Sequence, residues 1–189
     1  TGDNPLIAGL ERLPVPNTTL AIFGATGDLC RRKLLPALYN LAHEGALPER
    51  FNLIGVSRRD QSDEEFRDFA RESIKEFSRR EADETVLEGL LERLSYIGFS
   101  FDDQEGYGKL GKALDALESE GHALNRAFYL STAPEFFGVI TTALKEAKLT
   151  IPVVLTSHMV MDWLGYDLDF PGMSLVGPVL GSVIFFWAG

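Results

Sequence analysis

The fold of this chain is decided by a short apolar run and the glycine turn that follows it: Leu20-Ala21-Ile22-Phe23-Gly24-Ala25-Thr26-Gly27-Asp28-Leu29. The run up to Gly24 is short and apolar, as in a strand that is buried on both faces of a sheet. Beyond the turn, leucines recur at helical spacing as far as Leu41, and Gly45 offers a left-handed stop. The stretch therefore predicts a buried strand that leads through a tight turn into a helix.

The same alternation repeats along the first 148 residues. Ser62-Asp63-Glu64-Glu65 forms a capping box, and Pro134 suits the first turn of the last helix. The expected strands are residues 20–24, 52–57, 95–99 and 125–130, and the expected helices start at 28, 62, 83, 104 and 134 and end near 45, 79, 94, 120 and 148. Because crossovers of this length join parallel strands, we predict an α/β fold: a Rossmann-like, doubly wound parallel sheet.

Composition limits the classes of protein to consider. A chain of 189 residues with 45% hydrophobic and 24% charged residues fits one ordinary globular domain. Its single cysteine, Cys30, excludes an internal disulfide, and no basic stretch followed by an apolar run marks a secretory signal, so a cytoplasmic location is expected. The net charge of -10 argues against a nucleic-acid surface, because neutralising phosphates needs a concentrated basic face.

The distribution of charge divides the chain into two parts near residue 149. All Lys and Arg lie at or before Lys148, and the stretch from Phe170 to Gly189 carries no formal charge. Because Pro5, Pro14 and Pro16 lie near the start, we expect an irregular lead-in over residues 1–18, followed by the α/β domain over 19–149 and a hydrophobic tail over 150–189.

The turn from Gly24 to Leu29 is a candidate phosphate site. Glycines between a strand and a helix allow close backbone approach, and the helix start adds free N–H groups and positive potential. The Gly-x-x-Gly pattern is less specific than the full dinucleotide fingerprint. The alternative is a plain tight turn in which Asp28 is the helix N-cap.

The end of the second strand favours NADP as the cofactor. NAD enzymes commonly place Asp or Glu there to bind the ribose 2′-hydroxyl, whereas this chain has Ser57-Arg58-Arg59. A guanidinium binds phosphate oxygens bidentately, which suits a 2′-phosphate. Two solvated arginines are the alternative, and Arg58 lies further from Gly24 than the usual spacing of about 20 residues. Ser131-Thr132, after a later strand, could let a ribose or nicotinamide approach, or form an ordinary turn.

These residues resemble the coenzyme domain of the glucose-6-phosphate dehydrogenase family. The family's signature turn is matched by Gly24-Ala25-Thr26-Gly27-Asp28-Leu29-Cys30-Arg31-Arg32-Lys33-Leu34-Leu35-Pro36, with Cys30 as the one small departure. Further matches are Ile54-Gly55-Val56-Ser57-Arg58, Ser95-Tyr96 and Phe128-Tyr129-Leu130-Ser131-Thr132-Ala133-Pro134. The resemblance covers residues 19–149. It implies NADP-dependent oxidation of glucose 6-phosphate to 6-phosphogluconolactone, a step of the pentose phosphate pathway.

The resemblance also implies roles for single residues. The turn and helix start would cradle the pyrophosphate, Arg58 would select NADP, and Lys33 would lie near both the cofactor and the sugar phosphate. The predicted cofactor-binding residues are Gly24, Ala25, Thr26, Gly27, Asp28, Leu29, Arg31, Arg58, Tyr96, Ser131 and Thr132, and the predicted substrate-binding residue is Lys33.

The chain departs from the family's pattern after residue 149. The family's Glu-Lys-Pro-Phe-Gly and Arg-Ile-Asp-His-Tyr-Leu-Gly-Lys segments have no counterpart, and His43, His122 and His158 match none of its substrate-binding or catalytic histidines. We therefore assign no catalytic residue, expect no turnover by the chain alone, and expect glucose 6-phosphate to bind only if the missing domain is supplied. His158 lies near Met159 and Met161, but without a cysteine cluster we assign no metal site.

The tail over 150–189 resembles a membrane-helix pair of heavy-metal-transporting P-type ATPases. The resemblance is carried by Ile151-Pro152-Val153-Val154-Leu155, Trp163-Leu164-Gly165, Phe170-Pro171-Gly172 and the run from Val179 to Gly189. It indicates a junction of two gene fragments or a chimaera, and an alternative function as a membrane-associated or interaction fragment that could reach a membrane through residues 170–189. Alternatively, residues 151–157 could supply a substitute strand of the sheet.

Overall fold

The computed structural model describes residues 16–119 and 125–149. The elements, in chain order, are β1 (Thr18–Phe23), a π-helical turn η1 (Cys30–Leu34), α1 (Leu35–His43), β2 (Phe51–Ser57), α2 (Asp63–Phe77), α3 (Glu84–Leu91), β3 (Leu94–Gly98), α4 (Gln104–Ser119), β4 (Asn125–Leu130), a 3-10 turn η2 (Pro134–Phe136) and α5 (Phe137–Glu146). Every predicted strand and helix is therefore confirmed, with small shifts at the ends. The predicted tail over 150–189 and most of the lead-in lie outside the described residues.

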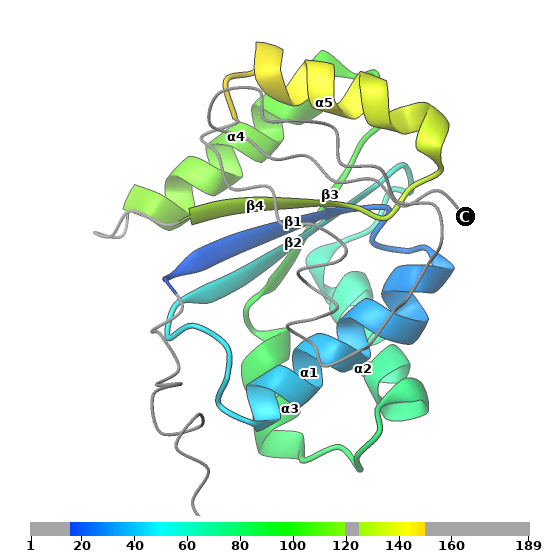
Figure 1. The fold of residues 1–189 in the computed structure, drawn as a ribbon, viewed down its shortest axis with the longest axis vertical. Coiled ribbons are helices and arrows are strands. Elements are labelled where there is room, and N and C mark those ends of the chain that lie inside the picture. The colour runs from blue at the N-terminus through cyan, green and yellow to red at the C-terminus, as the bar shows by residue number, and fades with distance from the viewer. Residues whose placement is uncertain (1–15, 120–124, 150–189) are drawn as a thin grey trace, which may run out of the picture.

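The four strands form one parallel sheet in the order β3-β2-β1-β4. Phe23 at the end of β1 is level with Val56 of β2 and with Leu130 of β4. The chain thus builds outward from β1 to β3 and then crosses back to place β4 on the other side of β1 (Figure 1). This reversal confirms the predicted doubly wound, Rossmann-like sheet and puts its topological switch point between β1 and β4.

Helices cover both faces of the sheet. In Figure 1, α1, α2 and α3 lie on one face, and α4 and α5 lie on the other. Successive residues of β1 face opposite layers: Ile22 packs into the cluster built with α1 to α3, whereas Ala21 and Phe23 pack into the cluster built with α4 and α5. Burial on both faces explains why β1 is apolar from Leu20 to Phe23 instead of alternating with polar residues. Among the described residues, no helix has the length and apolar character that crossing a membrane requires.

The helix that follows β1 contains an irregular turn. Helical residues run from Asp28 to His43, with a π turn from Cys30 to Leu34 in which Leu35 N donates to Cys30 O. Pro36 accounts for it, because a proline inside a helix clashes with the carbonyl four residues earlier and a wider turn relieves that clash. Gly45 ends the segment with a φ of +62°, which confirms the predicted left-handed stop.

The polar start of α2 is as predicted. Ser62 Oγ accepts from Glu65 N at 3.2 Å, and Ser62 N donates to Glu65 Oε2 at 2.7 Å, which completes the capping box. Asp83 caps α3 in a simpler way, because its Oδ1 accepts from Thr85 N and Val86 N.

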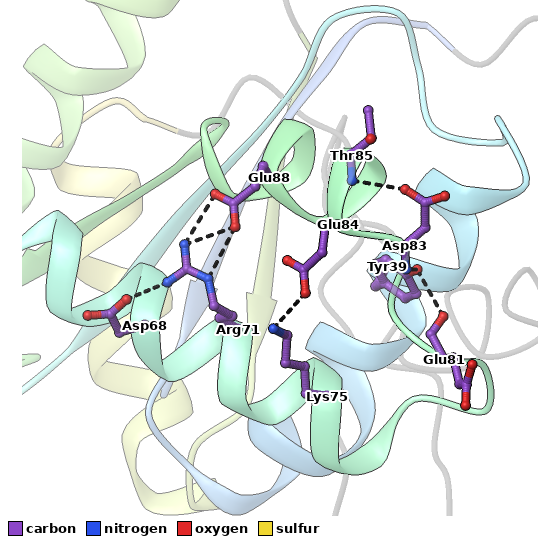
Figure 2. Close-up of polar contacts among 9 residues, drawn as sticks. All are labelled: Tyr39, Asp68, Arg71, Lys75, Glu81, Asp83, Glu84, Thr85 and Glu88. Atoms are coloured by element: carbon purple, nitrogen blue, oxygen red, sulfur yellow. Dashed lines mark hydrogen bonds and ion pairs between the residues drawn. The ribbon is translucent and has the colours of Figure 1, made fainter.

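A buried tyrosine ties α1 to the connection between α2 and α3 (Figure 2). Tyr39 is 0% exposed, and its hydroxyl accepts from Asp83 N at 2.8 Å and donates to Glu81 O at 3.4 Å. An exposed ion pair joins α2 to α3 nearby, with Lys75 Nζ 2.8 Å from Glu84 Oε1. The buried hydroxyl has the larger energetic role, because water screens exposed ion pairs.

The ends of β1 and β4 meet at a glycine. Gly24 has a φ of +85°, and a Cβ atom built on it would lie 2.1 Å from Ser131 O. Ser131 N donates to Phe23 O at 2.8 Å, which holds the two strand ends together. A side chain at position 24 would therefore separate the strands at the switch point.

Gly24→Ala should destabilise the domain much more than Gly45→Ala. Both glycines have positive φ, which costs an alanine about 1–2 kcal/mol, but nothing lies within 4 Å of a Cβ at Gly45. Urea unfolding followed by circular dichroism should show a loss near this value for Gly45→Ala and at least about 2 kcal/mol more for Gly24→Ala. Equal losses would contradict the close contact with Ser131.

Tyr39→Phe should lower the free energy of unfolding by about 1–2 kcal/mol, because it leaves Asp83 N and Glu81 O without their partner. Lys75→Gln, which removes an ion pair between two half-exposed side chains, should cost less than about 0.5 kcal/mol. The same unfolding measurement compares them, and a larger loss for Lys75→Gln would show that the surface pairs stabilise this corner.

Candidate functional site

Most of the predicted cofactor-binding residues come together at the carboxyl edge of the sheet. The turn from Gly24 to Leu29 follows β1, Arg58 follows β2, and Ser131 and Thr132 follow β4, while Tyr96 lies within β3. All four strands are parallel, so their carboxyl ends meet at one edge of the sheet, around the switch point. Ligands of open α/β sheets bind in such a place.

The backbone of the turn divides its amides into two groups. Gly24 N and Ala25 N both donate to Val56 O, at 2.8 and 3.2 Å, and Gly27 N donates to Gly24 O at 2.9 Å. Three of the amides in the predicted cradle therefore stabilise the turn itself. The glycines instead allow the backbone of the turn to fold tightly, because a Cβ atom at Gly27 would lie only 3.0 Å from Gly24 O.

The remaining amides belong to the start of the helix. Arg31 N donates to Gly27 O at 3.0 Å, which is the first bond of the helix. The amides of Asp28, Leu29 and Cys30 consequently have no acceptor within the helix. Gly27 occupies the N-cap place and Asp28 lies inside the first turn, so the alternative in which Asp28 is the N-cap is wrong. Free amides at a helix start favour an anion.

Arg58 is exposed at the same edge and is held by aromatic rings. Its Cζ lies 5.2 Å from the centroid of the Phe136 ring and 6.0 Å from that of Phe101. A guanidinium over an aromatic face gains cation–π attraction while its N–H groups stay available for oxygen acceptors. Neither aromatic residue was among the predicted site residues, because each comes from a separate loop.

Arg31 and Lys33 lie in different surroundings. Arg31 Nη2 is 2.7 Å from Glu76 Oε2, and its Cζ lies 5.5 Å from the centre of the Phe77 ring, so the guanidinium head packs against the end of α2. Arg31 Nε is buried and, within the described ranges, without a hydrogen-bond partner. Lys33 is exposed within the π turn. The structure thus brings neither cation into contact with Arg58.

Two hydroxyl groups beside the turn have unused hydrogen-bonding capacity. Ser131 Oγ and Thr132 Oγ1 are buried atoms with no partner among residues 16–119 and 125–149. An unsatisfied buried hydroxyl costs about 1–3 kcal/mol. Such groups next to Gly24, at the switch point, are suited to a polar ligand.

A chain of hydroxyl groups connects the turn to the arginine loop. Ser57 Oγ lies 3.0 Å from Thr26 Oγ1 and 2.7 Å from Tyr96 Oη, and Tyr96 Oη donates to Arg59 O at 2.8 Å. Tyr96, a predicted cofactor ligand, is only 7% exposed. Burial raises the pKa of Tyr96, so the phenol keeps its proton at neutral pH. Sequence reasoning missed Ser57, although a serine between a buried strand and two arginines was a usable signal.

Cys30, the departure from the family's signature, faces the interior. The thiol is 0% exposed, and burial raises its pKa to about 12. It therefore stays protonated and is no nucleophile at neutral pH. Burial also raises the pKa of the neighbouring Tyr129 to about 12, with a smaller contribution from Cys30. Within the part of the chain that the structure describes, no group of His, Cys, Asp and Glu side chains could hold a metal ion.

Comparisons with known proteins identify the family of this site. The family model described as "Glucose-6-phosphate dehydrogenase, NAD binding domain" matches residues 21–168, which include the first part of the predicted tail. The glucose-6-phosphate 1-dehydrogenase of Chlamydia pneumoniae is 44% identical over 135 residues, which are 71% of this chain and 26% of that protein. The enzyme of Leuconostoc mesenteroides is 38% identical over 156 residues, which are 80% of this chain and 31% of that protein.

A solved structure agrees with this result. A glucose-6-phosphate dehydrogenase in complex with its substrate glucose-6-phosphate superposes with a TM-score of 0.66 at 32% identity, over 75% of this chain and 30% of that chain. This chain thus spans between a quarter and a third of the length of the relatives that it matches. Through its NAD-binding domain, the chain belongs to the glucose-6-phosphate dehydrogenase family.

Proposed function

We propose that this domain binds NADP and supplies the coenzyme site of a glucose-6-phosphate dehydrogenase. The observation that carries the proposal is the pair Arg58 and Arg59 at the end of β2, where an NAD-specific domain would commonly have an acidic residue. Membership of the family supports the fold and the class of coenzyme, and the arginines support the choice of NADP over NAD.

The diphosphate of NADP would bind at the start of the helix after β1. The amides of Asp28, Leu29 and Cys30 have no acceptor within the helix, and the dipole adds positive potential there. Gly24 and Gly27 let the turn pack closely beside this helix start, because a Cβ atom at either position would crowd a backbone oxygen. Because the chain has a net charge of -10, this local positive potential, not the net charge, would attract the coenzyme.

Arg58 would hold the 2′-phosphate. Its aromatic neighbours Phe136 and Phe101 restrict the guanidinium before any ligand arrives, which lowers the entropy that binding would otherwise cost. Arg59, the next residue, adds a second positive charge to the same loop.

Ser131 and Thr132 would bind the nicotinamide half. Both residues lie beside Gly24, across the switch point from the arginines, and their hydroxyl oxygens have no partner within the described residues. NADP, when bound, accepts a hydride from the substrate. We place glucose 6-phosphate near Lys33, and its oxidation requires the parts of the relatives that this chain does not match.

The predicted alternative, a membrane-associated or interaction fragment whose tail derives from a P-type ATPase, falls on residues outside the described part. The family match to residue 168 favours the coenzyme domain over this alternative, and a cytoplasmic location agrees with that choice. Fractionation without detergent tests it, because recovery of the protein in the membrane pellet would favour the tail as the working part.

Arg58→Ala should weaken NADP binding by about tenfold to a hundredfold and leave NAD binding within about twofold, because it removes one charged hydrogen-bonding partner of the 2′-phosphate. Isothermal titration calorimetry with both coenzymes measures the two affinities. Arg80→Ala is the control: Arg80 pairs with Glu44 beyond the end of α1 and should leave both affinities unchanged. Equal affinity of the unaltered chain for NADP and NAD, unchanged in Arg58→Ala, would refute the assignment.

A further inference from the structure

Ser57 occupies the centre of a hydrogen-bond network that joins the turn after β1, the end of β2 and the middle of β3. Its Oγ contacts Thr26 Oγ1 at 3.0 Å, Tyr96 Oη at 2.7 Å and Arg59 N at 3.3 Å. The residue is 5% exposed, in the sheet beneath the candidate site. Ser57 is therefore placed to act on its neighbours, not on a ligand.

The direction of each hydrogen bond in this network follows from its last acceptor, the carbonyl oxygen of Arg59. The Arg59 carbonyl can only accept, so Tyr96 Oη donates its proton to Arg59 O, at 2.8 Å. Tyr96 Oη must then accept from Ser57 Oγ, so the single hydroxyl proton of Ser57 is donated to Tyr96. Ser57 Oγ is left as the acceptor for both Thr26 Oγ1 and Arg59 N. Each of the three hydroxyls thus donates its one proton, and Ser57 Oγ uses both lone pairs as acceptors, so the roles do not conflict.

This network fixes the backbone between the two arginines. Arg59 N and Arg59 O are both bound by it, so the peptide units on either side of Arg59 cannot rotate freely. Gly98 also packs closely against Arg59, because a Cβ atom built on Gly98 would lie 2.5 Å from Arg59 O. Tyr96 is itself anchored, since its N donates to Asp63 Oδ1 at 2.6 Å.

The network also joins the two halves of the candidate site. Thr26 belongs to the turn at which the diphosphate would bind, and the Arg58–Arg59 loop would bind the 2′-phosphate. In NADP these phosphates are separated by a ribose, so the distance between their two protein sites matters for binding. Ser57 Oγ accepts hydrogen bonds from both Thr26 Oγ1 and Arg59 N, and these two bonds hold that distance.

We propose that Ser57 and Tyr96 are positioning residues for coenzyme selection: they hold the Arg58–Arg59 loop against the phosphate turn and thereby raise the preference for NADP over NAD. The inference rests on the proposed function, since it needs the arginines to bind the 2′-phosphate. It assigns Tyr96 a role through Arg59, in addition to any direct contact with the coenzyme.

The test measures the ratio of NADP to NAD affinity in the full 189-residue chain by calorimetry, for Ser57→Ala and Tyr96→Phe. Each variant should lower the ratio by about fivefold or more, which corresponds to one lost hydrogen bond. Adenosine 2′,5′-bisphosphate, which carries the 2′-phosphate without the nicotinamide, should lose affinity by the same factor. Matched controls are Ser73→Ala and Tyr39→Phe, which remove buried hydroxyls that bond to backbone atoms elsewhere; both should keep the ratio.

A double-mutant cycle separates positioning from general damage to the fold. In an Arg58→Ala, Arg59→Ala background, Ser57→Ala should have no further effect on the ratio, because it acts through those arginines. Equal weakening of NADP and NAD binding, an unchanged affinity ratio in Tyr96→Phe, or an equal effect in the controls would overturn the inference.

The same measurements separate this inference from the proposed function. If the unaltered chain prefers NADP and Arg58→Ala removes that preference while Ser57→Ala does not, the inference alone fails. If the unaltered chain shows no preference for NADP, the proposed function fails with it.

Discussion

The hydrogen bond from Ser131 N to Phe23 O, with Gly24 packed against Ser131 O, is the contact on which the site depends. It joins β1 to β4 at the point where the strand order reverses. The first helix starts on the β1 side of this contact, and on the β4 side lie Ser131 and Thr132, whose hydroxyls have no partner within the part of the chain that the structure describes. A side chain at position 24 would push the two strand ends apart and separate these two parts of the candidate site.

The architecture around this contact separates stability from binding. The clusters on the two faces of the sheet bury apolar side chains from all four strands, which supplies the dominant favourable term in folding. Among the described residues, buried polar atoms without a partner include Ser131 Oγ and Thr132 Oγ1 in the loop after β4, at the carboxyl edge. The loops after β1 and β3 are held by backbone bonds to Val56 O and Ser57 O, so the edge is shaped before any ligand arrives.

Much of this arrangement could be predicted from the sequence, because it depends on local patterns. The apolar run before Gly24, the capping box at Ser62 and the stop at Gly45 each specify a structure over a few residues, and the structure confirms all three. The predicted turn was also right in its position. The amides were less predictable: that Gly24 N and Ala25 N bind Val56 O depends on how β2 lies beside β1, which no local pattern encodes. The Ser57 network and the rings beneath Arg58 were missed for the same reason, since each joins residues that are far apart in the sequence.

Because Cys30 is buried, the reactivity of its thiol reports how often this part of the domain opens. The chain has one cysteine, and this thiol lies in the first helix next to the amides of the candidate site, with no exposed surface. A thiol reagent can modify it only when local opening of that helix or unfolding of the domain exposes the sulfur, so the modification rate reports how often the thiol becomes accessible. Any molecule that binds the helix start would slow labelling in proportion to its occupancy, with no need for a dye, an engineered tag or a catalytic assay.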